Sequence, residues 1–200
     1  VNDGSLDQTG EVLRRRLDSG EPRLRVVTHD VNRGKGAAIR SGLVAATSDY
    51  VAIQDADAEY DPSDLSRIFA ELEKGTADVV FGSRFLRFNP TLYRTYLIGN
   101  KALTTLVNVI GGGRLTDAYT CYKAMSLRRW RDLDLQSDGF EVEAEISMKC
   151  LLAGWKVTEV PIGYRPRSFS EGKKIRGRDA VKGVLTIIRF GLLRPRIGQR

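Results

Sequence analysis

Residues that commonly bind zinc are scarce in this sequence. Its 200 residues include two cysteines and one histidine. Cys121 and Cys150 do not have the spacing of a zinc motif, so we expect two reduced thiols, as in a cytosolic protein. His29, the single histidine, is assigned no catalytic role. We therefore look for the functional groups among carboxylates and cations.

Long apolar runs are also absent. No uninterrupted stretch approaches the roughly 18 residues that cross a bilayer, and no signal peptide is visible. The sequence does not begin with methionine, and Val1-Asn2-Asp3-Gly4-Ser5 reads as a strand end followed by a turn. We therefore expect that a first strand is missing before Val1. With 42% hydrophobic residues, the chain is long enough for one domain with a real core.

Acidic residues are fewer than basic ones, and the excess of basic residues lies at the C-terminal end. The formal net charge is +7, and the segment from Arg165 to Arg200 holds eleven Lys and Arg residues against two acids. This excess favours phosphates, nucleic acid or an anionic membrane surface as partners. Because no nucleic-acid-binding module is recognisable, we expect no nucleic acid partner.

A short apolar run that ends in alternating carboxylates is the most informative stretch. Residues 51–53 read as a buried strand, followed by Asp55 and Asp57. Side chains two apart on an extended segment point the same way, so both carboxylates can face one spot and attract a divalent cation. The alternative is a strand end followed by an acidic turn. Glu59 and Asp61 are interpreted as the start of the next helix.

Apolar periodicity predicts alternating strands and helices. We expect strands at 24–28, 51–53, 77–82, the end of 115–125 and 155–164, and helices at 10–17, 37–46, 63–74, 89–113 (one or two), 140–154 and 178–193. This alternation predicts a mostly parallel α/β sheet with helices on both faces. Pro161 favours an edge position for the last strand. Ligands bind beyond the carboxyl ends of such strands, where we expect Asp3, Asp55, Asp57 and Arg84 to meet.

Two loops carry groups suited to a nucleotide. Asp3 and Ser5 follow a strand and offer hydrogen bonds to a ribose or base, although plain turn chemistry explains them too. Gly34, Lys35 and Gly36 precede a helix, and its free N–H groups and dipole favour a phosphate-binding turn. The glycine spacing matches neither the P-loop nor the dinucleotide fingerprint.

Other segments have two interpretations each. The apolar helices expected at 89–113 either pack in the core or lie against a membrane or lipid tail, and the basic helix at 178–193 either packs on the domain or binds an anionic membrane surface. The cation-rich loop at 165–175 suits a diphosphate. Asp117, Glu141 and Glu143 either cap helices or return to the site.

The order of these motifs resembles inverting GT-A glycosyltransferases that use nucleotide sugars, and within them the polyprenol-phosphate sugar synthases. The matching pieces span nearly the whole chain and are Asn2 to Ser5 with Asp7 and Thr9, Asn32 to Gly36, Gln54 to Pro62, Gly82 to Arg84, Thr116 and Asp117 through Cys121 to Lys123, and Glu171 to Ile175. Asn2 stands where the family often has Asp, a departure that would modestly alter base recognition.

The resemblance implies a role for each matching residue. The nucleotide would contact Asp3, Gly4, Ser5, Lys35 and Asp55. Asp57 would hold Mg²⁺ or Mn²⁺ on the donor diphosphate and act with Asp117 as a catalytic residue, with Asp57 the stronger candidate. The residues that would neutralise phosphates are Arg84, Arg167, Lys173 and Lys174.

We therefore expect a hexosyltransferase that moves a sugar from a UDP- or GDP-linked donor to polyprenyl or dolichyl phosphate with inversion. Residues 1–165 would form the catalytic domain, and 166–200 a basic loop with an amphipathic helix on the cytoplasmic face of a membrane. A transferase acting on a soluble or polysaccharide acceptor, and an inactive fragment that only binds nucleotide sugars, are the alternatives.

Overall fold

The strands form two sheets within residues 1–91, 93–167 and 177–193, which are the residues that this computed structural model describes. The smaller sheet pairs β1 (Asn2–Asp3) with β2 (Thr28–His29) in parallel, with Asp3 opposite His29. β2 is shorter and later than the strand expected at 24–28, so His29 lies on a strand rather than in the following loop.

The larger sheet has the order β3-β5-β4-β6. Its strands are β3 (Tyr50–Ala52), β5 (Lys123–Ser126), β4 (Val79–Ser83) and β6 (Val157–Pro161). β5 runs antiparallel to both of its neighbours, and β4 pairs with β6 in parallel. Every strand of this sheet except β5 thus shares one direction, and β6 lies at an edge, as Pro161 predicts.

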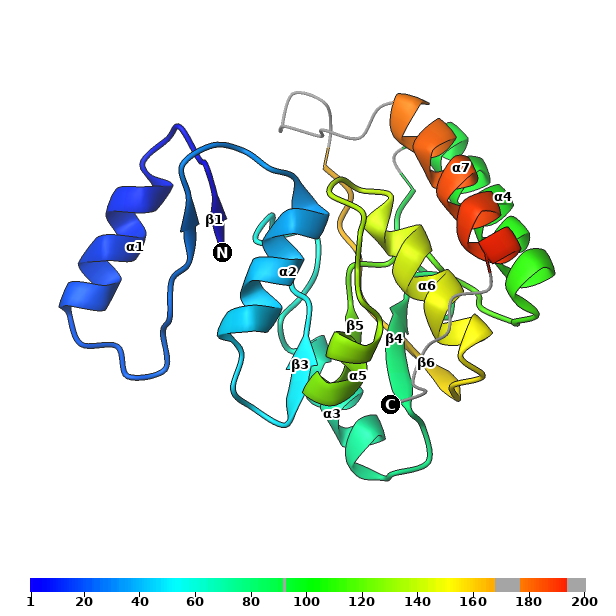
Figure 1. Cartoon of the computed structure of the whole chain (residues 1–200), viewed down its shortest axis with the longest axis horizontal. Helices are drawn as coiled ribbons and strands as arrows, with labels where there is room; N and C mark the ends of the chain where they lie inside the picture. The colour runs from blue at the N-terminus through cyan, green and yellow to red at the C-terminus, as the bar shows by residue number, and fades with distance from the viewer. Residues whose placement is uncertain (92, 168–176, 194–200) are drawn as a thin grey trace.

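Helices pack on both faces of this sheet (Figure 1). In chain order the helices of the described residues are α1 (Thr9–Asp18), which lies apart from this sheet, α2 (Lys35–Ala45), α3 (Asp64–Glu73), α4 (Arg94–Gly111), α5 (Leu127–Asp132), α6 (Val142–Leu152) and α7 (Gly177–Leu193). Successive side chains of a strand point to opposite faces. Phe81 accordingly joins a core cluster with Met148 of α6 and Ile187 of α7, whereas Val80 packs with Ile68 of α3. The predicted α/β architecture is confirmed.

The C-terminal helix α7 is integrated into this core. It lies beside α4 and α6 (Figure 1), and Ile187 and Phe190 are buried. Gly191 permits the close approach to α4, because a Cβ there would lie 2.2 Å from Cγ2 of Ile110. The division of the chain at residue 165 stays a prediction.

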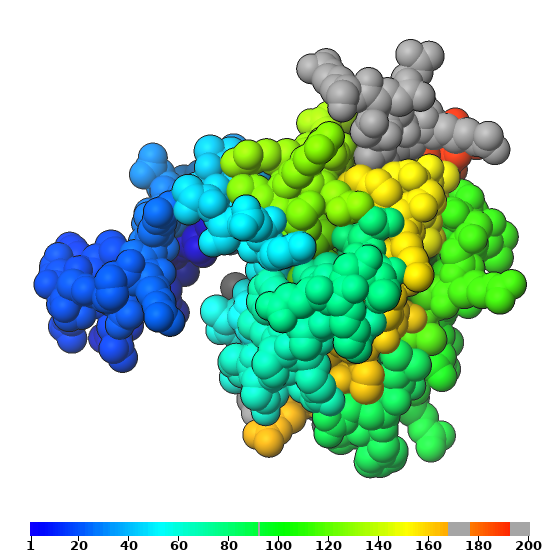
Figure 2. All heavy atoms as spheres, turned by 90° about the horizontal axis from the view of Figure 1, so that it is seen from below, coloured from blue at the N-terminus to red at the C-terminus, as the bar shows by residue number. Residues whose placement is uncertain are grey.

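The N-terminal segment contributes least to the core. α1 has no buried residue, and in the space-filling view the N-terminal residues project from one side of the body (Figure 2). The segment expected to form one or two helices at 89–113 is the single helix α4, which ends at Gly112 in a left-handed conformation. Both cysteines are buried and free, as expected.

One helix was not predicted. α5 is only six residues long and follows β5 directly. It begins at Ser126, whose hydroxyl accepts the backbone N–H of Arg129 at 3.3 Å. A serine before Leu127 is an N-cap signal, but a single turn of helix gives too few residues for a periodic pattern.

Candidate active site

The loop after β3 presents two carboxylates, each with its own cation. Lys35 Nζ lies 2.8 Å from Asp55 Oδ2, and Arg167 Nη2 lies 2.8 Å from Asp57 Oδ2. Ala58 adopts a left-handed backbone with a φ of 58°, which turns the chain immediately after Asp57. The acidic loop therefore collects a cation from α2 and another from the segment that follows β6.

Asp57 lies in an environment that suits a divalent cation. Burial raises its pKa, against the lowering effect of the Glu59 amide and of Arg167. An added cation would relieve this desolvation and the repulsion from nearby Asp55 and Glu59. Within the described residues, no group of three or more His, Cys, Asp or Glu side chains is arranged to hold a metal. An ion at Asp57 would have one or two protein carboxylates as ligands, a number that Mg²⁺ commonly takes in proteins.

Glu59 fastens the segment that carries Arg167. Its carboxylate accepts the backbone N–H of Arg167 at 2.9 Å and the hydroxyl of Tyr164 at 3.3 Å, and its carbonyl accepts the N–H of Arg165 at 2.9 Å. The interpretation of Glu59 as a helix start was therefore wrong. Asp61 does have that role, because its carboxylate accepts the N–H of Ser63 at 2.9 Å before α3.

Lys35 connects the acidic loop to α6. Its ammonium lies 2.7 Å from Glu143 Oε1 as well as 2.8 Å from Asp55 Oδ2. Burial lowers the pKa of Lys35, but the charges of Glu143 and Asp55 outweigh it and raise that pKa well above its usual value. Glu143, one of three acids that the sequence left open, therefore does return to the site.

Asp3 anchors a neighbouring loop. Its carboxylate accepts the N–H groups of Arg33 at 2.9 Å and Gly34 at 2.8 Å and contacts His29 Nδ1 at 2.7 Å. Burial raises the pKa of Asp3, but the bonds from His29 and the two amides outweigh it and lower that pKa. His29 also bonds Ser41 of α2 at 2.8 Å. Sequence reasoning missed this link because the two strands carrying Asp3 and His29 are very short.

Gly4 and Ser5 shape the turn after β1. Gly4 has a φ of 65°, and a Cβ there would lie 2.5 Å from the backbone N of Asn32. The N–H of Ser5 donates to Asn2 Oδ1 at 3.2 Å. These residues thus bring the turn into contact with the loop that Asp3 anchors, and their contact with a nucleotide stays a prediction.

The start of α2 is not a free anion site. The N–H groups of Gly36 and Ala37 donate to the carbonyl of Asp138 at 2.7 and 3.2 Å. A Cβ at Gly36 would lie 2.0 Å from the carbonyl oxygen of Ser137, so glycine serves close packing. Because these amides are already bonded to another loop, the prediction that they bind a phosphate is wrong.

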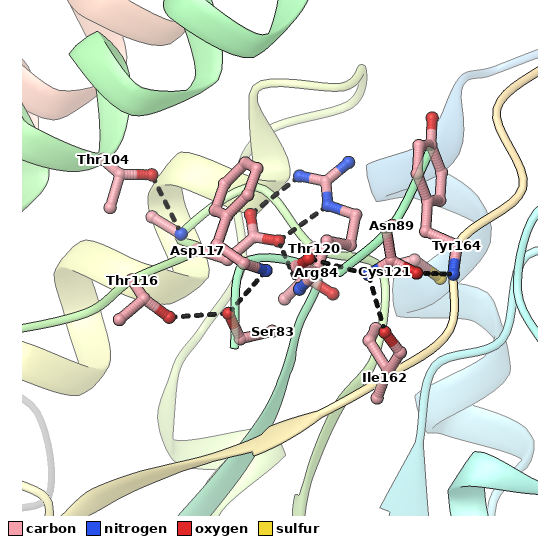
Figure 3. Close-up of polar contacts among 12 residues, drawn as sticks. Ser83, Arg84, Asn89, Thr104, Thr116, Asp117, Thr120, Cys121, Ile162 and Tyr164 are labelled. Carbon is pink, nitrogen blue, oxygen red and sulfur yellow. Dashed lines mark hydrogen bonds and ion pairs between the residues drawn. The ribbon is translucent and has the colours of Figure 1, made fainter. Parts of the chain in front are cut away.

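Arg84 and Asp117 form a buried, bidentate ion pair (Figure 3). Arg84 donates from Nε to Oδ2 and from Nη2 to Oδ1, both at 2.7 Å, and Asp117 is completely buried. Glu159 holds the same loop by accepting the N–H groups of Thr116 and Asp117 at 2.7 and 2.9 Å. Burial raises the pKa of Glu159, while these two amides lower it. Asp117 therefore has Arg84 as its partner rather than an open face toward a substrate.

The remaining predicted phosphate ligands fall into two groups. Arg167 lies at the acidic loop, where its guanidinium contacts Asp57. Lys173 and Lys174 lie outside the described residues. Whether Arg84 and Arg167 bind phosphates stays a prediction.

Comparisons with known proteins agree on one family. A family model described as "Glycosyl transferase family 2" matches residues 1–129. Glycosyltransferase AglJ of Haloferax volcanii is 31% identical over 169 residues, which cover 84% of this chain and 53% of the relative. A dolichyl-phosphate hexose transferase of the same organism is 28% identical over 169 residues, covering 83% and 69%. The chain thus spans about half the length of AglJ and 40% of a hexosyltransferase named Agl6.

Solved structures show the same fold. Glucosyl-3-phosphoglycerate synthase from Mycobacterium tuberculosis in complex with Mg²⁺ and UDP has a TM-score of 0.65 and 23% identity, covering 98% of this chain and 67% of that one. The same protein with Mn²⁺, UDP-glucose and phosphoglyceric acid gives a TM-score of 0.64 and 22% identity, covering 94% and 66%. At this identity the likeness establishes the GT-A fold.

Proposed function

The chain belongs to glycosyl transferase family 2, and we propose that it transfers a hexose from a UDP- or GDP-linked donor to polyprenyl or dolichyl phosphate with inversion. The observation that carries the donor half is the pair of carboxylates beyond β3, each joined to a cation. A nucleoside diphosphate needs both kinds of group. Cations compensate its charge, and a carboxylate holds the divalent ion that accompanies it.

The donor roles follow from these positions. Asp57 is the proposed ligand of Mg²⁺ or Mn²⁺, and Arg167, already beside it, is the proposed partner of the diphosphate. Asp55 and Lys35 would contact the nucleoside end. The bound cation would stabilise the negative charge that develops on the leaving nucleoside diphosphate. The relative glucosyl-3-phosphoglycerate synthase supports this choice, as its structures include Mn²⁺ or Mg²⁺ with UDP.

The acceptor chemistry explains why no strong base is required. A lipid phosphate is already ionised near neutral pH and can attack the anomeric carbon from the face opposite the leaving group. That attack inverts the configuration at this carbon. The burial of Asp117 against Arg84 is compatible with this reaction, since the pair is then needed for the fold around β4 rather than for proton transfer.

An exposed apolar stripe on α7 supports a lipid acceptor. Val181, Leu185, Ile188 and Leu192 recur at helical spacing, and Leu192 is 80% exposed. The exposed cations Arg178, Lys182 and Arg189 lie along one side of this stripe, because residues of an α-helix are about 100° apart. Apolar residues bordered by cations suit a membrane with anionic headgroups.

Neighbouring α4 extends the apolar surface. Val107 packs in the core, whereas Ile98 and Val109 are exposed. Within the described residues, no helix has the length and apolarity needed to cross a membrane. The exposed apolar and cationic residues of α7 lead us to propose peripheral contact with the cytoplasmic face of a membrane. The dolichyl-phosphate hexose transferase among the relatives supports the same class of acceptor.

A transfer assay with competing acceptors tests the proposal. Labelled UDP- and GDP-hexoses are incubated with the protein, Mg²⁺, and either polyprenyl phosphate or water-soluble acceptors. Label recovered in the organic phase as a lipid phosphate sugar that is both alkali-stable and acid-labile supports the proposal. Transfer only to the soluble acceptors, or none with either donor, would contradict it.

Binding to vesicles tests the membrane surface separately. The variant Leu185→Ser/Leu192→Ser should lose co-sedimentation with vesicles that contain anionic phospholipid. Val44→Ser, which changes an 85% exposed apolar residue of α2, is the matched control and should bind like the wild type. Equal binding by both variants would reject α7 as the membrane surface.

A further inference from the structure

Four side chains of alternating charge form a line from the acidic loop into the core. Asp55 contacts Lys35, Lys35 contacts Glu143 Oε1, and Glu143 Oε2 contacts Lys123. Lys123 also donates to the carbonyl oxygen of Thr120. The four residues come from the loop after β3, from α2, from α6 and from β5, so the line joins elements that are far apart in sequence.

Lys123, the innermost residue of this line, has no role so far. Its side chain is fully buried, and its ammonium lies 4.9 Å from the centre of the Phe81 ring. Burying an ammonium is unfavourable unless it is paired, and an apolar side chain of similar length would fill the same space. Packing alone therefore does not account for a lysine at this position.

The charge of Lys123 matters because Glu143, if unpaired with it, would compete with Asp55 for Lys35. Lys35 lies between two carboxylates, 2.8 Å from Asp55 and 2.7 Å from Glu143. Without Lys123, Lys35 would be the only cation among the described residues that pairs with Glu143, and Glu143 would draw its ammonium away from Asp55. The three remaining charges would also sum to a net negative charge beside the loop that is to receive a diphosphate, and like charges repel.

We propose that Lys123 is a positioning residue for the nucleotide, which neutralises Glu143 and so leaves Lys35 oriented on Asp55. This assignment rests on the proposed function, because that proposal places the nucleotide at Asp55 and Lys35. Lys123 itself is buried and touches no substrate. Its effect is on the position of Lys35 and on the net charge of the site.

A charge-restoring double variant separates positioning from packing. Binding of UDP and GDP is measured by calorimetry in the presence of Mn²⁺. Lys123→Met should raise the dissociation constant about tenfold, the size that coupling between contacting charged residues reaches. Adding Glu143→Gln removes the competing carboxylate, so the double variant should return to within about threefold of the wild type. A double variant as weak as Lys123→Met, or a single variant as tight as the wild type, would overturn the assignment.

The variant Glu143→Gln covers the case in which Lys123→Met does not fold. It leaves Lys35 with Asp55 alone, so nucleotide binding should be as tight as in the wild type or tighter. Binding that is about tenfold weaker would overturn the assignment, because Glu143 would then act on the nucleotide in its own right. Circular dichroism of each variant establishes that it is folded.

A second buried ion pair on α6, the helix that carries Glu143, provides a matched control. Lys149 lies 2.6 Å from Glu145, and both are buried on α6, but neither contacts Lys35 or Asp55. Lys149→Met should lower thermal stability without weakening nucleotide binding. If it weakens binding as much as Lys123→Met does, loss of a buried lysine explains both effects and the assignment is overturned.

The crystal structure of the Lys123→Met variant gives a readout that needs no nucleotide. The assignment predicts that Lys35 leaves Asp55 and remains on Glu143. A Lys35 ammonium still within hydrogen-bonding distance of Asp55 would overturn it. If the wild type binds neither UDP nor GDP while Lys35 moves as predicted, the proposed function fails and the charge coupling stands.

Discussion

Arg167 donates from Nη2 to Asp57 Oδ2 at 2.8 Å, although the two residues are 110 positions apart. Asp57 is the carboxylate proposed to hold the divalent cation, so in this arrangement the guanidinium supplies the positive charge. Glu59 keeps it there by binding the N–H of Arg167 at 2.9 Å. Arg167 and the proposed metal ion would therefore compete for one oxygen of Asp57.

Removing this competitor should strengthen metal binding. In Arg167→Gln without nucleotide, we expect Mn²⁺ to bind about fivefold more tightly, as the loss of one nearby positive charge implies. Sugar transfer should fall in the same variant, because the diphosphate loses a cation. Calorimetry with Mn²⁺ measures the first effect. Arg165→Gln, which changes an exposed arginine two residues away, is the control, and unchanged or weaker Mn²⁺ binding in Arg167→Gln would refute the competition.

The pair of Arg84 and Asp117 should contribute mainly to stability. Asp117→Asn leaves a buried guanidinium without a counter-charge and should lower the free energy of unfolding by about 3–5 kcal/mol. Replacing both residues, as Arg84→Met/Asp117→Leu, should recover part of this loss. Urea denaturation measures both variants. Full stability of Asp117→Asn together with lost transfer would instead indicate that Asp117 acts as a base.

The turn after Asp57 should tolerate glycine better than alanine. Ala58 has a φ of 58°, a conformation that is unfavourable for any residue with a Cβ. Ala58→Gly should therefore stabilise the protein by about 0.5–1 kcal/mol, and Ala58→Val should destabilise it. Ala56→Gly, nearby but without a positive φ, should lower stability instead. Equal changes in thermal stability for Ala58→Gly and Ala56→Gly would contradict this explanation of the turn.

Asp3 should make stability depend on pH in the acidic range. Its pKa is lower in the folded protein than its ordinary value of 3.8, so the unfolded state binds the proton more readily. The stabilisation by Asp3 is thus complete well above pH 3.8 and is lost as the pH falls through the folded-state pKa. The difference in unfolding free energy between the wild type and Asp3→Asn should shrink as the pH falls from 7 toward the folded-state pKa of Asp3. A difference that stays constant from pH 7 to pH 3 would argue against it.

Sequence patterning predicted the architecture because apolar residues recur at strand or helix spacing in the elements that pack in the core. The apolar run Val79–Phe81 and the helical spacing of Ile68 and Leu72 are local signals, and both residues of that spacing are buried. The antiparallel direction of β5 could not be read in this way. It depends on pairing with β3 and β4, whose residues are distant in sequence, and a four-residue strand has no signal for direction.

The sequence predicted the two carboxylates of the candidate site. It did not predict which cations contact them. Asp55 and Asp57 were singled out because a short acidic pattern after an apolar run is visible locally. Lys35 was assigned to the nucleotide and Arg167 to a phosphate. Their contacts with these acids depend on how α2 and the chain after β6 return to the loop. Lys123 lies in a stretch that matches the family pattern, but its buried ion pair was not predicted, because a lysine at the start of a strand usually indicates exposure.

We propose that Asp57 supports metal-dependent transfer of a hexose to a lipid phosphate. The most direct measurement is the rate at which label passes from UDP- or GDP-hexose to polyprenyl phosphate with Mg²⁺, for the wild type, Asp57→Asn and Asp61→Asn. We expect transfer by the wild type and by Asp61→Asn, and a rate at least about a hundredfold lower for Asp57→Asn. An Asp57→Asn variant that transfers the sugar as fast as the wild type would contradict it.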